Sequence, residues 1–256
     1  MGCSSDKEKN LYDRHQNNEK QSCLKYQPIF LFNLDLIDKF LFKPRVREYF
    51  QKISQNLDLI NKTDESVFPG LFETIEDDMR NLFKRLNIEF IIPTKSNSIT
   101  HSDRFIINYH PPTKHDLDFF LPIFILEFSL YPASLIKKTE LKSIIFVNSI
   151  FYSSDVITNE YRAAVPDYLH TQSLYLSTKE RNPQYIRNII HHEFFHYIDW
   201  ADDKTFEDNE WKSLNFSGFE YGKVDFLVEN MNDYKGFVNF CSLHGLEEDK
   251  AEIFSY

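Results

Sequence analysis

Glycine, cysteine and long apolar runs are all scarce in this chain of 256 residues. Only six glycines occur, and no glycine-rich phosphate-binding pattern lies at a strand-to-helix junction, which argues against nucleotide-binding folds. The three cysteines, Cys3, Cys23 and Cys241, have no paired spacing, so neither a disulfide framework nor a thiolate zinc cluster is expected. The longest apolar stretch, 119–131, is too short to span a bilayer and contains Glu127.

Positive charge is also in deficit. The chain has 29 lysines and arginines against 39 aspartates and glutamates, and residues 201–256 alone carry −8 of the net charge of −10. Such a composition, without a basic cluster, argues against a nucleic-acid partner. The first residues lack the apolar core of a secretory signal. We therefore expect a cytoplasmic protein, and we expect it to be a monomer.

The N-terminal segment, residues 1–26, is polar and has almost nothing to bury, so we expect a disordered tail. Its start resembles an N-myristoylation site at Gly2, beside a Cys3 that palmitate can modify, although Asp6 stands where the motif has Ser or Thr. Two acyl chains would anchor the chain stably. Attachment to the cytoplasmic face of a membrane through acylated Gly2 and Cys3 is one alternative, and an unmodified tail is the other.

Residues 27–256 are long enough for one domain, and their patterns predict the α+β class. Apolar residues at helical spacing predict two or three helices within 28–87. Strand-like runs at 88–92 and 104–109 predict short strands, separated by a polar loop over 93–103.

Further along, a helical pattern covers about 116–137 and is expected to break near Pro132. The runs 141–147 and 173–177 are rich in Ile, Phe, Val, Leu and Tyr, which predicts two more strands. The strands before and after residue 140 are all short, so we expect only a small sheet.

A chemical motif lies in the next predicted helix, over 183–200, for which Asn182 is a favourable N-cap. The helix contains H-E-x-x-H as His192, Glu193 and His196. Histidines four apart lie on one face, so both imidazoles can reach one tetrahedral Zn²⁺. Glu193 projects beside the metal, where it can take a proton from zinc-bound water and deliver it to a leaving amine.

A catalytic zinc usually needs a third protein ligand. Residues 247–254 predict a helix in which Glu248 and Glu252 share a face. Glu248 can bind zinc while Glu252, one turn on, accepts a hydrogen bond from a ligand histidine. On chemistry alone Glu247 and Asp249 compete for the ligand position, although they point about 100° away from Glu248.

These segments together resemble the gluzincin zinc metallopeptidases, most nearly the zinc-binding peptidases related to the anthrax lethal factor catalytic domain, in which H-E-x-x-H precedes an E-x-x-A-E helix. The resemblance implies one Zn²⁺ per chain held by His192, His196 and Glu248, with Glu193 as general base and Glu252 supporting a ligand. It covers roughly 141–256 and rests on 174–177, 191–199, 211–215, 218–222, 236–238 and 248–252.

The resemblance also implies a zincin-like domain over 27–256. We expect a helical N-terminal part with short strands over 27–140 and a metal-binding catalytic part over 141–256. The catalytic part would have a small mixed sheet whose edge includes 174–177, with the H-E-x-x-H helix beneath it and the second ligand on a C-terminal helix. An extended peptide could then add to that edge.

One departure from the family concerns the group that stabilises the oxyanion. These relatives have a tyrosine some seven residues before the ligand Glu, where this chain has Cys241, and a thiol is a weak donor. Tyr221, Tyr234 and His244 are the candidates to replace it.

The expected function is a zinc-dependent endopeptidase acting on a peptide or protein substrate. One alternative is a catalytically silent zinc-binding scaffold, tethered to a membrane if the N-terminus is acylated. The other is a globular interaction protein in which the motif arose by chance.

Overall fold

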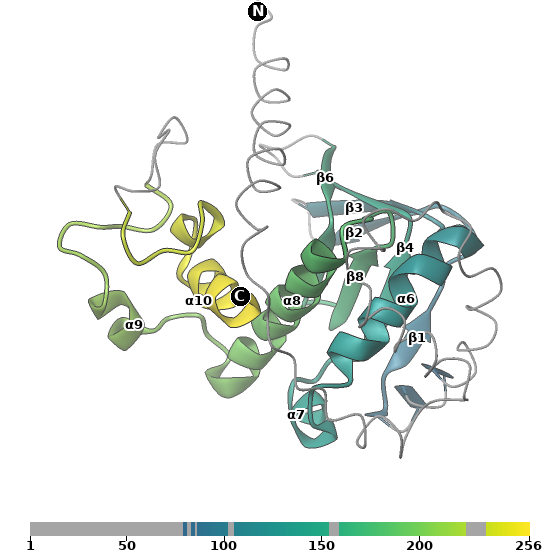
Figure 1. The fold of residues 1–256 in the computed structure, drawn as a ribbon, viewed down its shortest axis with the longest axis horizontal. Helices are drawn as coiled ribbons and strands as arrows, with labels where there is room; N and C mark the ends of the chain where they lie inside the picture. Colours follow the sequence, from purple (N-terminus) through teal and green to yellow (C-terminus); the bar gives the residue numbers. More distant parts are fainter. Residues whose placement is uncertain (1–78, 81–82, 85, 102–104, 154–158, 224–233) are drawn as a thin grey trace, which may run out of the picture. The chain divides into compact units, whose positions relative to one another are not determined.

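The computed structural model has an α+β fold, as the sequence predicts, and its described part holds five α-helices and two four-stranded sheets (Figure 1). None of the helices in this part is both long enough and apolar enough to cross a membrane. The predicted tail, its acylation and most of the helices predicted within 28–87 lie outside the described residues. The structure describes residues 79–80, 83–84, 86–101, 105–153, 159–223 and 234–256.

The first sheet has the strand order β1-β4-β8-β7, and β1, β4 and β8 run parallel. Their positions confirm the strands predicted at 88–92, 141–147 and 173–177. The expectation that 174–177 forms the sheet edge is wrong, because β7 pairs antiparallel with β8 and covers it. The sequence did not predict β7, because it contains Pro166 and proline within a strand is tolerated mainly at sheet edges. The strands are β1 Glu89–Ile91, β4 Ser143–Val147, β7 Ala164–Asp167 and β8 Ser173–Ser177.

A second sheet, antiparallel throughout, has the order β2-β3-β5-β6, so the expectation of a single sheet is wrong. The loop predicted over 93–103 contains β2, which pairs with β3. This strand is polar and lies at the sheet edge, so its sequence lacks the apolar alternation of a buried strand. The strands are β2 Asn97–His101, β3 Phe105–His110, β5 Ser149–Ser153 and β6 Glu160–Arg162.

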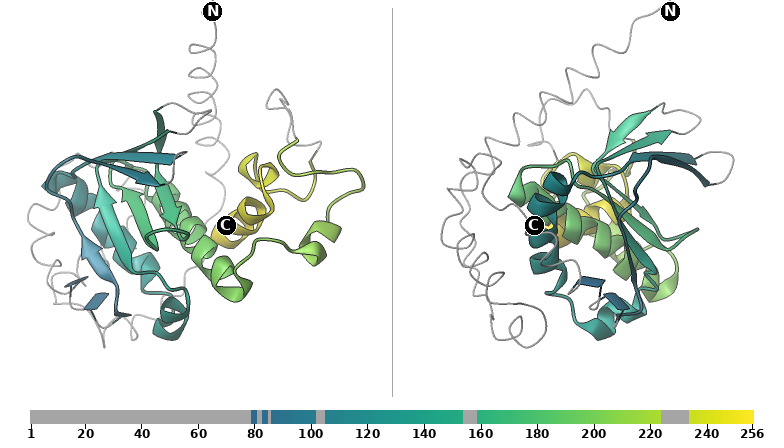
Figure 2. Two further views of the ribbon diagram at one scale, coloured as in Figure 1. Left: turned by 180° about the vertical axis from the view of Figure 1, so that it is seen from behind. Right: turned by 90° about the vertical axis from the view of Figure 1, so that its right-hand side faces the viewer.

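Strand β4 lies at the centre of the core and is buried on both faces. Successive side chains of a strand alternate between its faces. Ile145 and Val147 accordingly pack in the cluster shared with the second sheet. Phe146 points the other way, where its ring lies 4.9 Å from that of Phe124 on α6. The first sheet is therefore sandwiched between the second sheet and the helices (Figure 2).

The helices lie mainly on the face of the first sheet opposite the second sheet, with α6 and α8 side by side (Figures 1 and 2). The predicted break near Pro132 is confirmed, because α6 ends before it and α7 begins directly after it. The helices are α6 Lys114–Phe128, α7 Ala133–Lys138, α8 Pro183–Asp203, α9 Asn209–Ser213 and α10 Leu246–Ser255, with a 3₁₀ turn at Cys241–Leu243.

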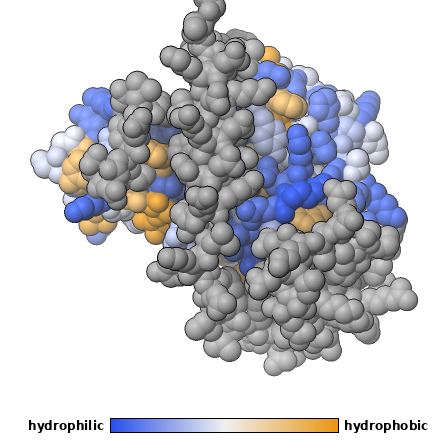
Figure 3. All heavy atoms as spheres, turned by 45° about the horizontal axis from the view of Figure 1, so that its top comes forward, coloured by the Kyte–Doolittle hydropathy of each residue, from blue (hydrophilic) through white to orange (hydrophobic). Residues whose placement is uncertain are grey.

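The part of the chain that holds α9 and α10 exposes several apolar side chains. Leu214, Phe216, Phe254 and Tyr256 are each at least 44% exposed. Figure 3 shows apolar residues in orange among hydrophilic ones in blue on the left of the molecule, where this part lies. Apolar surface thus adjoins the helix that carries Glu248.

A buried carboxylate fixes the start of α6. Asp116 accepts hydrogen bonds from the Thr113 amide and hydroxyl, at 2.9 and 2.7 Å, and from the Asn148 amide at 2.9 Å. It also pairs with Arg181, which lies just before α8. Burial raises the pKa of Asp116, but these hydrogen bonds lower it by more, so the net shift is downward.

Replacing this carboxylate should destabilise the fold in a pH-dependent way. Asp116→Asn turns an acceptor into a donor that faces other donors, so we expect a loss of about 1–3 kcal/mol in the free energy of unfolding. Because folding lowers the pKa of Asp116, its stabilisation is present above its ordinary pKa of 3.8 and is lost as the pH falls through the folded-state value. Urea denaturation should show this loss of unfolding free energy at neutral pH and a smaller loss in acid. An equal loss at the two pH values would contradict a stabilising role for the Asp116 carboxylate.

Candidate metal centre

Helix α8 carries the central motif and begins where the sequence predicts. Asn182 caps it by accepting hydrogen bonds from the Gln184 and Tyr185 amides at 3.0 and 3.3 Å, and Pro183 occupies its first turn. The helix continues to Asp203, three residues beyond the predicted end. Its apolar side chains Ile186, Ile190, Phe194 and Tyr197 are fully buried, which fixes the helix against the rest of the domain.

His192, His196 and Glu248 come together in space. One ligand atom from each lies within 4.8 Å of the others, so this group could hold a metal ion. The Nε2 atom of His192 is 3.1 Å from Glu248 Oε2, and that of His196 is 3.8 Å from Oε1. Bonds of about 2.0–2.1 Å from a tetrahedral metal would set its ligand atoms about 3.3–3.4 Å apart. The observed separations bracket that spacing.

Glu252 lies on the other side of His192. Its Oε1 is 3.3 Å from His192 Nδ1, and the Asn239 side-chain amide donates to its Oε2 at 2.6 Å. His192 is thus held between two carboxylates of α10, Glu248 at Nε2 and Glu252 at Nδ1. A carboxylate at Nδ1 orients a ligand imidazole and directs its Nε2 lone pair at the metal.

Glu193 has the environment of a general base. Its Oε2 atom is buried and has no hydrogen-bond partner in the part of the chain that the structure describes. Burial raises the pKa of Glu193 to about 7, against the effect of His192, which lowers it. A carboxylate whose pKa lies near neutrality can both accept and return a proton.

The two histidines differ in their charge state before any metal binds. Burial lowers the pKa of His196 to about 4, so this imidazole is neutral at physiological pH, the form that binds metals. Burial also lowers the pKa of His192, but its hydrogen bonds to Glu248 and Glu252 raise it by more. His192 and Glu248 therefore form an ion pair in the absence of metal, and binding would release a proton from His192.

The competing carboxylates of α10 are placed elsewhere. Asp249 is buried and accepts hydrogen bonds from Trp211 Nε1 at 2.9 Å and from the Tyr221 hydroxyl at 2.8 Å. Glu247 folds back over Gly245, so that a Cβ atom on that glycine would stand 2.6 Å from its Oε1. Neither joins the group of His192, His196 and Glu248.

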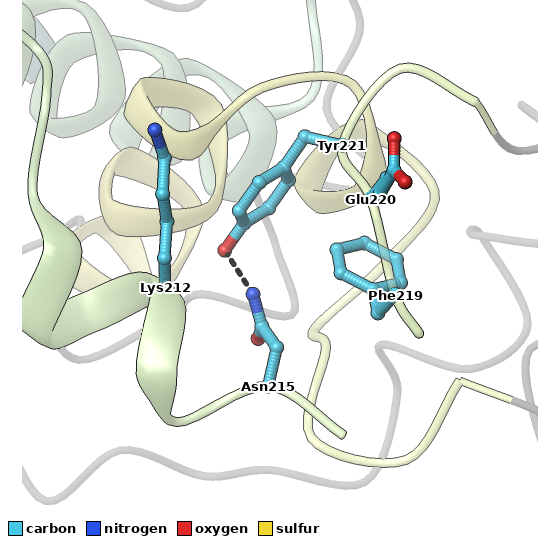
Figure 4. A pocket seen from close by; sticks show the side chains of 5 residues that line it. All are labelled: Lys212, Asn215, Phe219, Glu220 and Tyr221. Atoms are coloured by element: carbon cyan, nitrogen blue, oxygen red, sulfur yellow. Dashed lines mark hydrogen bonds between the residues drawn. The ribbon is translucent and has the colours of Figure 1, made fainter. Parts of the chain in front are cut away.

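Of the three candidates for oxyanion stabilisation, Tyr221 has its hydroxyl engaged in hydrogen bonds outside this group. Tyr221 lines a pocket of about 350 Å³ with Lys212, Asn215, Phe219 and Glu220, and its hydroxyl accepts from the Asn215 amide at 2.9 Å (Figure 4). That hydroxyl is already engaged, because it donates to the buried Asp249.

The other two candidates, Tyr234 and His244, lie between α9 and α10, as does Cys241, which stands where the relatives have a tyrosine. The Tyr234 ring lies 6.4 Å from those of Phe216 and Phe219. His244 follows the 3₁₀ turn, and its charge contributes to lowering the pKa of Glu248. Cys241 opens that turn and is exposed.

Tyr168 is a residue that sequence reasoning missed. It follows β7, and its ring packs 5.5 Å from that of Trp200 and 5.1 Å from that of Phe206. Burial raises its pKa to about 12, and the negative charges of Glu247, Glu248 and Glu193 add to the rise. No sequence signal identifies it, because its position depends on the path of β7, which the sequence did not predict.

Comparisons with family models, with curated proteins and with solved structures returned no match for this chain. What the group does is therefore argued from its own geometry and chemistry.

Removing one carboxylate at a time should rank the contributions to metal binding. We expect Glu248→Gln to weaken Zn²⁺ binding most, because it removes a ligand charge, and Glu252→Gln to weaken it about 10–100-fold through loss of the His192 contact. Glu247→Gln is the matched control and should bind as the wild type does. Titration against a chromophoric chelator measures all three, and a weakening in Glu247→Gln equal to that in Glu248→Gln would refute the assignment.

Proposed function

We propose that this protein is a zinc-dependent endopeptidase with a zincin-like domain, in the manner of the gluzincins. The observation that carries the proposal is a buried carboxylate oxygen of Glu193, which has no hydrogen-bond partner among the described residues and lies on the helix that carries both histidines of the group. A site that only holds a metal for structural reasons needs no base beside it. A peptidase needs one to move a proton from water to the leaving amine.

The donor set suits zinc. Two imidazole nitrogens and one carboxylate oxygen are the ligands of one class of catalytic zinc site, which keeps its fourth position for water or substrate. The Nδ1 atom of His192 faces Glu252 at 3.3 Å, as ligand histidines usually face a carboxylate or carbonyl. His192, His196 and Glu248 would hold one Zn²⁺ per chain.

The chain's own residues would then carry the proton transfers. Zinc, when bound, polarises the scissile carbonyl and lowers the pKa of a bound water. Glu193 would accept a proton from a water molecule as the oxygen of that water bonds to the carbonyl carbon. Glu193 would then return the proton to the amide nitrogen as the C–N bond breaks, which would regenerate its carboxylate.

The substrate would bind along β7 rather than along β8. Of the two outer strands of the first sheet among the described residues, β1 and β7, it is β7 that lies beside β8 and leads directly to Tyr168. An extended peptide can pair with the free side of an edge strand by main-chain hydrogen bonds. Membrane attachment through acylated Gly2 and Cys3 concerns where the protein is located, and it is a proposal separate from the one on peptide binding.

The alternative is a zinc-binding scaffold without catalysis. It is favoured by Cys241, a weak donor at the position where related peptidases have a tyrosine. It predicts stoichiometric zinc without peptide hydrolysis, so the variants below distinguish the two.

Glu193→Gln should abolish catalysis and leave the metal in place. The amide cannot accept the proton, so we expect peptide hydrolysis to fall by at least about 10²–10⁴. Elemental mass spectrometry should find one zinc per chain in both forms, and cleavage of a mixed peptide library should occur only with the wild type. Zinc without cleavage in the wild type would favour the scaffold, and absence of zinc from both would refute the proposal.

Tyr168→Phe tests whether Tyr168 stabilises the oxyanion, the role that a tyrosine has in the resembled peptidases at the position of Cys241. If the Tyr168 hydroxyl donates to the developing oxyanion, its removal should lower kcat by about 10²–10³ with little change in KM or zinc content. Tyr221→Phe should instead reduce stability, because it removes a hydrogen bond to buried Asp249, and should leave kcat nearly unchanged. The reverse pattern would assign the role to Tyr221.

A further inference from the structure

A second carboxylate is buried against α8, in a stretch of α6, residues 119–128, that is otherwise apolar. Glu127 of α6 is only 3% exposed. Its Oε1 atom forms an ion pair with Arg187 Nε at 2.9 Å, and its Oε2 atom lies 3.0 Å from His191 Nε2. Arg187 and His191 both belong to α8, so one side chain of α6 holds two points of the H-E-x-x-H helix.

The spacing of these points defines the rotation of α8 about its axis. Arg187 and His191 are four residues apart and so lie on one face, one turn apart. His192 and His196, also four apart, lie on the face about 100° further round. Both faces therefore meet carboxylates, Glu127 from α6 on one side and the pair Glu248 and Glu252 from α10 on the other.

Tyr131 connects this contact to α10. Its hydroxyl lies 2.5 Å from His191 Nδ1, so His191 is held at both ring nitrogens. Its ring lies 4.4 Å from that of Phe194 on α8 and stacks at 6.4 Å on that of Phe254. Phe254 stands two residues after Glu252 on α10.

Stability alone does not explain why this network is charged. Burying an ion pair costs desolvation energy that its attraction only roughly repays, and apolar residues of similar volume often stabilise a fold as much or more. What a buried charged contact can provide, and an apolar one cannot, is a single orientation and register. The surface that most needs one orientation here is the face that carries His192 and His196.

We propose that Glu127 and Tyr131 are positioning residues for the metal centre. They fix the rotation of α8 and its distance from α10, so that the imidazoles of His192 and His196 point at Glu248 before a metal arrives. This inference rests on the metal site of the proposed function, but not on its peptidase activity.

The test uses the full chain and measures two quantities for each variant, the melting temperature and the affinity for Zn²⁺. An effect on positioning is thereby distinguished from an effect on stability. Glu127→Gln keeps the shape and removes the charge, and Tyr131→Phe keeps the ring stack and removes the hydroxyl. Glu140→Gln is the matched control, because Glu140 pairs at 2.8 Å with Lys204 at the end of the same helix, but on the surface. Each variant is melted without metal and then titrated with Zn²⁺ at a temperature at which it is folded.

We expect Glu127→Gln to weaken Zn²⁺ binding about 10-fold or more, with a smaller effect in Tyr131→Phe and none in Glu140→Gln. The d–d absorption spectrum of bound Co²⁺ should also change in Glu127→Gln, because the ligand geometry is altered. A lower melting temperature with unchanged Zn²⁺ affinity and Co²⁺ spectrum would overturn the inference while leaving the peptidase proposal intact. If Glu127→Gln does not fold, the result for Tyr131→Phe decides. A wild type that binds no metal would overturn both proposals.

Discussion

The structure depends on one helix, α8, whose polar side chains need partners on more than one side. It packs against α6, α10 and β7, and eight of its 21 residues are buried, Arg187 and His196 among them. Buried polar groups need partners, and each neighbouring helix supplies a carboxylate, Glu127 from α6 and Glu248 from α10. The arrangement of the helices follows from the need to bring these charges to α8.

Helix α10 is shaped by the same requirement. Glu248, Asp249 and Lys250 are consecutive, and each has different partners: His192, then Trp211 and Tyr221, then Asp199 at 2.7 Å. The next residue, Ala251, is fully buried and leaves room for α8 to approach closely. Because these four consecutive residues are all held by contacts, the carboxylates of α10 can face α8 in one register, despite the low intrinsic stability of a helix of ten residues.

This packing bears on the candidate metal centre, because a group of ligands from two helices needs the separation of those helices to be fixed. Two imidazoles and a carboxylate bind zinc well only when their lone pairs converge within a few tenths of an ångström. The aromatic contacts of Phe254 with Tyr131 and Phe195 hold the far end of α10 in place. Glu193, the proposed general base, shares this setting, since it lies on α8 between the two histidines.

The sequence by itself determined the local elements. Periodicity and capping located α8, α10, β4 and β8, because these depend on short-range pattern and on residues such as Asn182. The spacing of H-E-x-x-H placed His192 and His196 on one face for the same reason.

Only the tertiary structure decided what depends on contacts between distant segments. It placed β7 outside β8, separated a second sheet, and brought Glu248 rather than Asp249 to the histidines. It also revealed Glu127, a charge in an apolar run whose partners lie some sixty residues away on α8. A sequence pattern specifies which residues share a face, but only chain packing specifies what that face meets.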